Sequence, residues 1–209
     1  MAKPKSEHIT LDLSGTRISY DSPLSYSKRY PRSPANVQTQ YRINIHDQDL
    51  YKKQHEYTKS KNLHAIRKSY WDYGRSLIWG TVKGTLSMSV SLYRTLQPEF
   101  DAQDPTAFIK ALQADYEEIY GKKDRKKKYN YKNIAPENYQ IKILSGISWG
   151  YYEYSAGGDI SVIYAYPLSD QHYFKVQFSF TSHSEDQKDK WELQAQATID
   201  FIMASFEVK

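Results

Sequence analysis

The chain has 209 residues, with 29 lysines and arginines against 24 acidic residues, 20 tyrosines and no cysteine. The absence of cysteine excludes disulfides, thiolate zinc sites, iron–sulfur clusters and a cysteine nucleophile. No stretch approaches the roughly 18 apolar residues that a membrane-spanning helix needs, and no apolar region follows the charged start. We therefore expect one domain over residues 1–209, without a membrane span or a signal peptide.

The first third of the chain predicts a hairpin followed by a polar insertion. Between residues 6 and 20, apolar and polar side chains alternate on both sides of Ser14-Gly15, which is typical of two strands and a tight turn. Prolines and serines then interrupt the pattern, a short strand is predicted over residues 41–45, and residues 47–64 are polar. We therefore interpret residues 22–64 as a polar insertion.

The middle of the chain predicts two strands and a helix. Residues 65–73 form the first strand, and residues 86–93 alternate apolar side chains with serines, which indicates a half-buried strand. Asp104 followed by Pro105 predicts a helix start, with a carboxylate at the N-cap and proline at the first helical position. Gly121 is the expected end of that helix.

The last third predicts four strands and a long final helix. The strands are expected over residues 139–144, 147–155, 160–166 and 173–181. The helix is expected over residues 185–204, and its predicted buried side chains are Trp191, Ala195, Ile199 and Ile202. Together these elements predict an α+β fold, with a mainly antiparallel sheet flanked by two long helices.

The positive charge is confined to one segment. Residues 122–128 contain six lysines and arginines and one aspartate, and without them the chain has equal numbers of positive and negative side chains. Affinity for DNA comes from many phosphate contacts spread along a groove, so this pattern does not favour nucleic acid. We interpret residues 122–128 as a basic loop, which is either solvated or directed towards an acidic partner.

One motif suggests an enzyme. Residues 146–150 match G-x-S-x-G, in which Ser148 would be the nucleophile of a hydrolase, and later aspartates and histidines could complete a triad. The residues after Gly150 predict a strand, whereas this motif requires a helix there. The polar segment around His46 offers nitrogen and oxygen ligands without an ordered metal spacing. We therefore predict no catalytic residue, no metal site and no cofactor.

Tyrosine and tryptophan gather where strands and turns meet. On a strand, alternation directs neighbouring side chains to opposite faces, so some of these rings are expected to be exposed. Exposed tyrosine and tryptophan provide stiff contact area with a polar group, which suits protein interfaces and also stacking on sugars or single-stranded nucleic acid. The predicted partner-binding residues are Tyr70, Trp71, Tyr73, Trp149, Tyr151, Tyr152, Tyr154, Lys126, Lys127 and Lys128.

The C-terminal third resembles the PsbP/DcrB-like fold group. The resemblance covers the hairpin over residues 162–180, the final helix with its tail Ile202-Met-Ala-Ser-Phe206, and the opening hairpin before Pro23. It implies an α/β/α sandwich and a mostly non-enzymatic group, which includes photosystem accessory proteins, a nuclear-transport factor and bacterial chaperones of type VI secretion effectors. No functional residue is carried over, because the resemblance contains no site motif.

These observations predict a non-enzymatic bacterial protein that acts by binding another protein. The expected role is that of an immunity protein that neutralises a toxin, or of a chaperone or adaptor for a secreted effector. The alternatives are a serine hydrolase that uses Ser148 and a module that binds glycans or RNA. The expected location is the cytoplasm, or the periplasm if a signal peptide has been removed.

Overall fold

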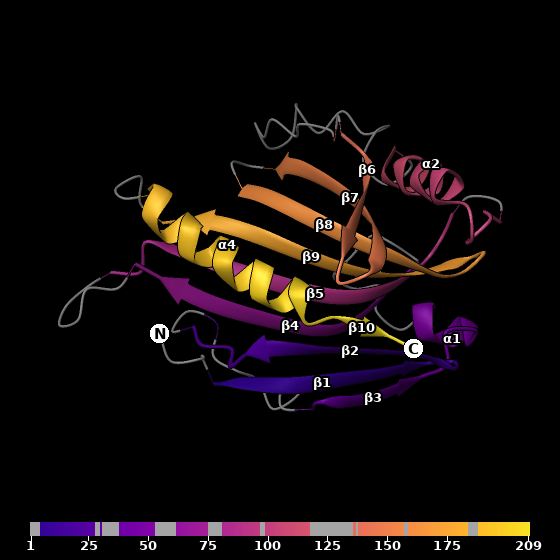
Figure 1. The fold of residues 1–209 in the computed structure, drawn as a ribbon, viewed down its shortest axis with the longest axis horizontal. Coiled ribbons are helices and arrows are strands. Elements are labelled where there is room, and N and C mark those ends of the chain that lie inside the picture. Colours follow the sequence, from indigo (N-terminus) through magenta and orange to yellow (C-terminus); the bar gives the residue numbers. More distant parts are fainter. Residues whose placement is uncertain are drawn as a thin grey trace.

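The strands of this chain build two separate sheets (Figure 1). The structure is a computed structural model, and it describes residues 5–27, 30, 38–52, 62–74, 81–96, 99–117, 136, 138–156, 159–183 and 188–209. The smaller sheet has the order β10-β2-β1-β3 and consists of β1 (Ser6–Leu13), β2 (Thr16–Pro23), β3 (Gln40–Ile43) and β10 (Glu207–Val208). The larger sheet has the order β4-β5-β9-β8-β7-β6 and consists of β4 (Leu63–Tyr73), β5 (Gly84–Arg94), β6 (Gln140–Leu144), β7 (Ile147–Ala156), β8 (Asp159–Ser169) and β9 (His172–Ser182).

The predicted opening hairpin is confirmed and forms the centre of the smaller sheet. β1 and β2 pair antiparallel, and the turn between them has positive φ angles of 55° at Ser14 and 103° at Gly15. Such angles are those of a tight hairpin turn, and glycine adopts them at no steric cost. β3 joins β1 in parallel, and β10 joins β2 antiparallel. The last residues of the chain therefore lie against its first hairpin.

The larger sheet is antiparallel at every described pairing. Its strands lie where alternation predicts them, each longer or shorter by a few residues. Register shifts occur between Pro167 and Ser169 in β8 and between Ala65 and Arg67 in the edge strand β4. Residues 25–27 run beside the same strand and exchange backbone hydrogen bonds of 2.9 and 3.1 Å with Tyr70 and Asp72. This short segment covers part of the sheet edge.

The main core lies between the two sheets. Apolar side chains from β1 and β2, with Ile9, Leu11 and Ile18 completely buried, face those of β5 and β9. The helix α4 (Lys188–Ala204) lies beside the smaller sheet on the same face of the larger one (Figure 1). Its predicted stripe is confirmed, because all four side chains are at most 1% exposed. These four are Trp191, Ala195, Ile199 and Ile202.

Two further helices lie at other positions around the larger sheet. α2 (Pro105–Tyr116) begins as predicted, since the carboxylate of Asp104 accepts a 2.8 Å hydrogen bond from the backbone N–H of Thr106. It packs on the opposite face from α4, over β6 and β7. The short helix α1 (Gln48–Lys52) lies beside β4. Gly121 and the basic loop of residues 122–128 lie outside the described residues.

The predicted fold class is wrong. The described chain is mostly β, and it forms two packed sheets with short helices rather than one sheet flanked by two long helices. The error has a physical cause. Alternation shows which side chains of the first hairpin share a face, and this pattern is the same whether the hairpin extends the main sheet or stacks on it. Here the hairpin belongs to a separate sheet, which shares the main core with the larger sheet and with α4.

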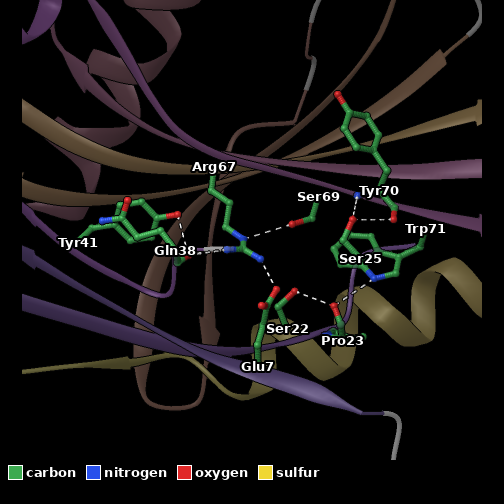
Figure 2. A network of polar contacts seen from close by, with 10 residues as sticks. All are labelled: Glu7, Ser22, Pro23, Ser25, Gln38, Tyr41, Arg67, Ser69, Tyr70 and Trp71. Atoms are coloured by element: carbon green, nitrogen blue, oxygen red, sulfur yellow. Dashed lines mark hydrogen bonds and ion pairs between the residues drawn. The ribbon is translucent and has the colours of Figure 1, made fainter. Parts of the chain in front are cut away.

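A buried ion pair connects the two sheets (Figure 2). The guanidinium of Arg67 in β4 donates to the carboxylate of Glu7 in β1, and their side chains are 0% and 10% exposed. The same guanidinium donates to the backbone carbonyl of Gln38 at 2.8 Å and towards the hydroxyl of Ser69 at 3.4 Å. Because a buried charge is costly unless it is paired and hydrogen-bonded, this network fixes how the sheets are placed relative to each other.

Candidate functional site

The candidate site is the face of the larger sheet that points away from the main core. We call it the outer face and define it by Ser87, Ser89, Gln177, Ser179 and Ser161 on three adjacent strands. Their neighbours in sequence point into the core, so these five point the other way. Ser161 is 5% exposed and the other four are half-buried. The outer face is therefore a flat surface of small polar side chains in the middle of the sheet.

Hydrogen bonds order the side chains of this face. The hydroxyls of Ser161 and Ser179 are 2.8 Å apart, directly across the pair of strands β8 and β9. The amide nitrogen of Gln177 donates to the hydroxyls of Tyr154 at 3.1 Å and of Ser179 at 3.3 Å. These contacts hold the polar groups in place before any partner arrives, which lowers the entropy cost of binding.

A tyrosine pair borders the outer face at its β4 edge. The ring of Tyr70 points away from the core, as Figure 2 shows, and stacks on Tyr30 with centroids 4.4 Å apart at 20°. Tyr30 is 40% exposed and Tyr70 is half-buried. Burial, followed by the nearby Tyr30, raises the pKa of the Tyr70 phenol, so the Tyr70 hydroxyl stays protonated at neutral pH.

A second tyrosine cluster borders the face at β7. Tyr154 is half-buried, with its ring centroid 5.6 Å from that of Tyr116 on α2, and Tyr152 lies 4.9 Å from Tyr139. Five adjacent strands run from β4 to β7, and at about 4.8 Å a strand the two borders are roughly 19 Å apart.

The helix α2 closes the remaining part of the same face. Beneath it, the carboxylate of Asp115 accepts hydrogen bonds from Thr95 at 3.0 Å, the backbone N–H of Leu96 at 2.9 Å and Tyr173 at 3.1 Å. Burial raises the pKa of this carboxyl, while the three donors act in the opposite direction. The network attaches α2 to β5 and β9, so we assign it a structural role.

Four of the predicted contact aromatics are buried. Trp149 is 0% exposed, Tyr151 5%, Tyr152 6% and Trp71 6%. Trp149, Tyr151 and Trp71 belong to the main core, whereas Tyr152 is covered by α2 and its neighbours. A ring without exposed area offers nothing to a partner, so this part of the prediction is corrected. The sequence could not show that these rings are buried. Alternation shows which face of the sheet a side chain is on, and both faces of β7 are covered by other elements.

The remaining predicted contact residues have different environments. Tyr70 and Tyr154 border the outer face, as described above. Tyr73 points to the core side, where its hydroxyl donates to Thr198 at 2.7 Å and its ring stacks on Trp191. Lys126, Lys127 and Lys128 lie outside the described residues. Sequence reasoning missed Tyr30, whose only signal was the general excess of tyrosine, because it lies in a segment with no regular pattern.

The G-x-S-x-G residues serve the fold. Gly146 has φ 77° in the turn between β6 and β7, and a side chain at Gly150 would collide with Leu112 and Phe108 of α2. Ser148 lies inside β7, and that strand continues to Ala156, where a nucleophile elbow would need a helix. Two candidate triad histidines have other partners, His172 with Ser169 and His183 with Thr85. The turn and the packing against α2 therefore account for Gly146 and Gly150 without a catalytic role.

Neither a metal cluster nor a membrane-spanning helix occurs in the described ranges. Within them, no three histidine, aspartate or glutamate side chains gather closely enough to hold a metal ion. Of the helices that the structure describes, none is long and apolar enough to cross a membrane.

Comparison with solved structures finds a weak likeness. No family model matches the chain, and no curated protein matches it. A crystal structure of LpqN, "involved in cell envelope biogenesis of Mycobacterium tuberculosis", aligns with a TM-score of 0.32 and 9% identity, over 70% of this chain and 90% of LpqN. A TM-score of this size does not indicate a shared fold. The resemblance to PsbP/DcrB-like proteins therefore stays a prediction from sequence.

Proposed function

We propose that this chain acts by binding another protein through the outer face, and that it performs no catalysis. The observation that carries the proposal is that the polar side chains of the outer face lie between two groups of tyrosines. Tyr30, Tyr70 and Tyr154 supply stiff aromatic area, and the serines and Gln177 supply hydrogen-bond donors and acceptors. Protein interfaces are enriched in tyrosine and combine aromatic contacts with a polar surround.

The role we propose is to neutralise a secreted toxin or to escort a secreted effector. Both roles require a preformed, complementary surface and no reacting group. A flat sheet face with ordered side chains meets that requirement, since it can cover a partner's active site or an aggregation-prone surface without moving. The glycines of the only motif that suggests an enzyme are explained by the turn at Gly146 and by packing at Gly150.

The test places a charge on the outer face and follows partner retention. Ser87→Arg adds a long charged side chain at a half-buried position between Tyr70 and Ser179, without altering a core contact. We expect the tagged protein to retain one stoichiometric protein from its native lysate at low and high salt. The variant should bind that protein at least about tenfold more weakly, because an unpaired charge opposes docking.

A matched control replaces an exposed residue on the opposite side of the molecule. Ala197→Arg lies on the solvent side of α4, which packs on the other face of the sheet. It should bind the partner as the unchanged chain does. Equal retention by Ser87→Arg and the unchanged chain would refute the outer face as the docking surface. Retention of a glycan in place of a protein would support the glycan-binding alternative instead.

A further inference from the structure

A second cluster of polar side chains lies at the far end of β5 and β9, beside α1. Arg94 and His172 are directly opposite each other in this antiparallel pair, so their side chains start from the same face of the sheet. The Nδ1 atom of His172 is 2.9 Å from the hydroxyl of Ser169. This hydrogen bond fixes the ring and leaves Nε2 as the nitrogen that points towards other groups.

Two residues from the segment around α1 complete the cluster. The ring of His46 meets His172 edge to face at 5.4 Å, and the ring of Tyr51 lies 5.8 Å from it. The hydroxyl of Tyr51 donates to the backbone carbonyl of Ile45 at 3.1 Å, which holds the segment in place. His172 and Tyr51 are 5% and 3% exposed, whereas His46 is exposed. The cluster therefore has a buried floor and opens to solvent at His46.

The neighbouring groups that shift the pKa of His172 electrostatically are His46 and Arg94. Burial, followed by the nearby His46 and Arg94, lowers the pKa of His172 to about 4. A carboxylate close to the ring would act oppositely. The acidic group nearest along the chain to His46, Asp47, accepts a 2.9 Å hydrogen bond from the backbone N–H of Asp49 at the start of α1. In the part of the chain that the structure describes, Arg94, His46 and His172 thus meet without a carboxylate among the groups that shift the His172 pKa.

We propose that Arg94, His46 and His172 form a binding site for a small oxyanion, a phosphate or carboxylate group. The planar guanidinium of arginine matches such a group with two parallel donors, and each imidazole adds one donor. A bound anion would be attracted by the charge of Arg94 and could accept a hydrogen bond from each imidazole. The site lies at the opposite end of the sheet strands from Tyr70, so it does not depend on the proposed protein-binding role.

The test is a titration of the intact protein followed by the NMR signals of its histidine rings. Inorganic phosphate and acetate are added separately, and sodium chloride is added in parallel to match ionic strength. We expect saturable shifts of the His46 and His172 signals with phosphate, acetate or both, and none with chloride. The anion should also raise the pKa of His172 from about 4 towards its ordinary value of 6.5.

Two variants assign the binding to this cluster. Arg94→Gln should weaken binding at least about tenfold, because it removes a charge-assisted contact. His46→Gln, at an exposed position, should also weaken it and leave the fold intact. Arg42→Gln is the matched control, since Arg42 is an exposed arginine on the smaller sheet, and should bind normally. No saturable shift in the unchanged protein, or equal binding by Arg94→Gln and Arg42→Gln, would overturn the proposal.

Discussion

Removing one partner of the buried ion pair between the sheets should destabilise the protein far more than removing both. In Glu7→Ala the guanidinium of Arg67 stays 0% exposed, and its described partners are then a neutral carbonyl at 2.8 Å and a hydroxyl at 3.4 Å. An uncompensated buried charge of this kind costs about 3–5 kcal/mol. That is a large share of the roughly 5–15 kcal/mol by which folded proteins are stable.

The measurement is the free energy of unfolding from urea titrations followed by circular dichroism, provided that the m-value is unchanged. The double variant Glu7→Leu/Arg67→Met removes both charges and keeps apolar volume, so it should be more stable than Glu7→Ala. Arg42→Ala breaks an exposed pair with Asp12 and should cost less than about 1 kcal/mol. A loss below about 1 kcal/mol in Glu7→Ala, or a double variant no more stable than it, would refute the reasoning.

Two further predictions concern the core and its pH dependence. Gly84→Ala would place a methyl group against the buried ring of Trp191 and should cost about 2 kcal/mol, and the loss should shrink when Trp191 is Phe. Calorimetry of the three variants would show it, and an additive result would contradict it. Because the pKa of His172 is lowered to about 4, the unfolded chain binds a proton that the folded chain does not between pH 6.5 and 4. Stability should therefore fall by roughly 3 kcal/mol as the pH decreases through this window, and His172→Gln should reduce the slope; an unchanged slope would contradict the assignment.

Local elements could be predicted from sequence because their causes are local. The turn at Ser14-Gly15 and the N-cap at Asp104 each depend on a few adjacent residues, and the structure confirms both. The same local patterns could not predict how the elements pack against one another. The polar pairing of Glu7 with Arg67, which joins the sheets, links residues 60 positions apart, and neither residue type is usual in a core.

The tyrosines show the same limit at the candidate site. Alternation along β7 correctly separates Trp149 and Tyr151 from Tyr152 and Tyr154. It could not reveal what covers each face of β7. Exposure depends on what lies opposite a residue, and β7 is covered by α2 on one face and by Phe206, which follows α4, on the other. Only contact information from distant parts of the chain separates a core tyrosine from an interface tyrosine.

The change of side-chain character along the outer face supports the proposal that its open part binds a partner. Tyr93, Ala165 and Tyr173 on this face belong to one buried cluster with side chains of α2, and the buried Ser91 and Lys175 lie next to that cluster on β5 and β9. Further along β5 and β9 the same face carries Ser87 and Ser179, with tyrosines at the borders. A permanent second layer would favour apolar side chains there, because burying hydroxyls is costly. A surface that is hydrated in the free protein and covered in a complex favours small polar side chains between aromatic rings. The open part of the outer face has this composition.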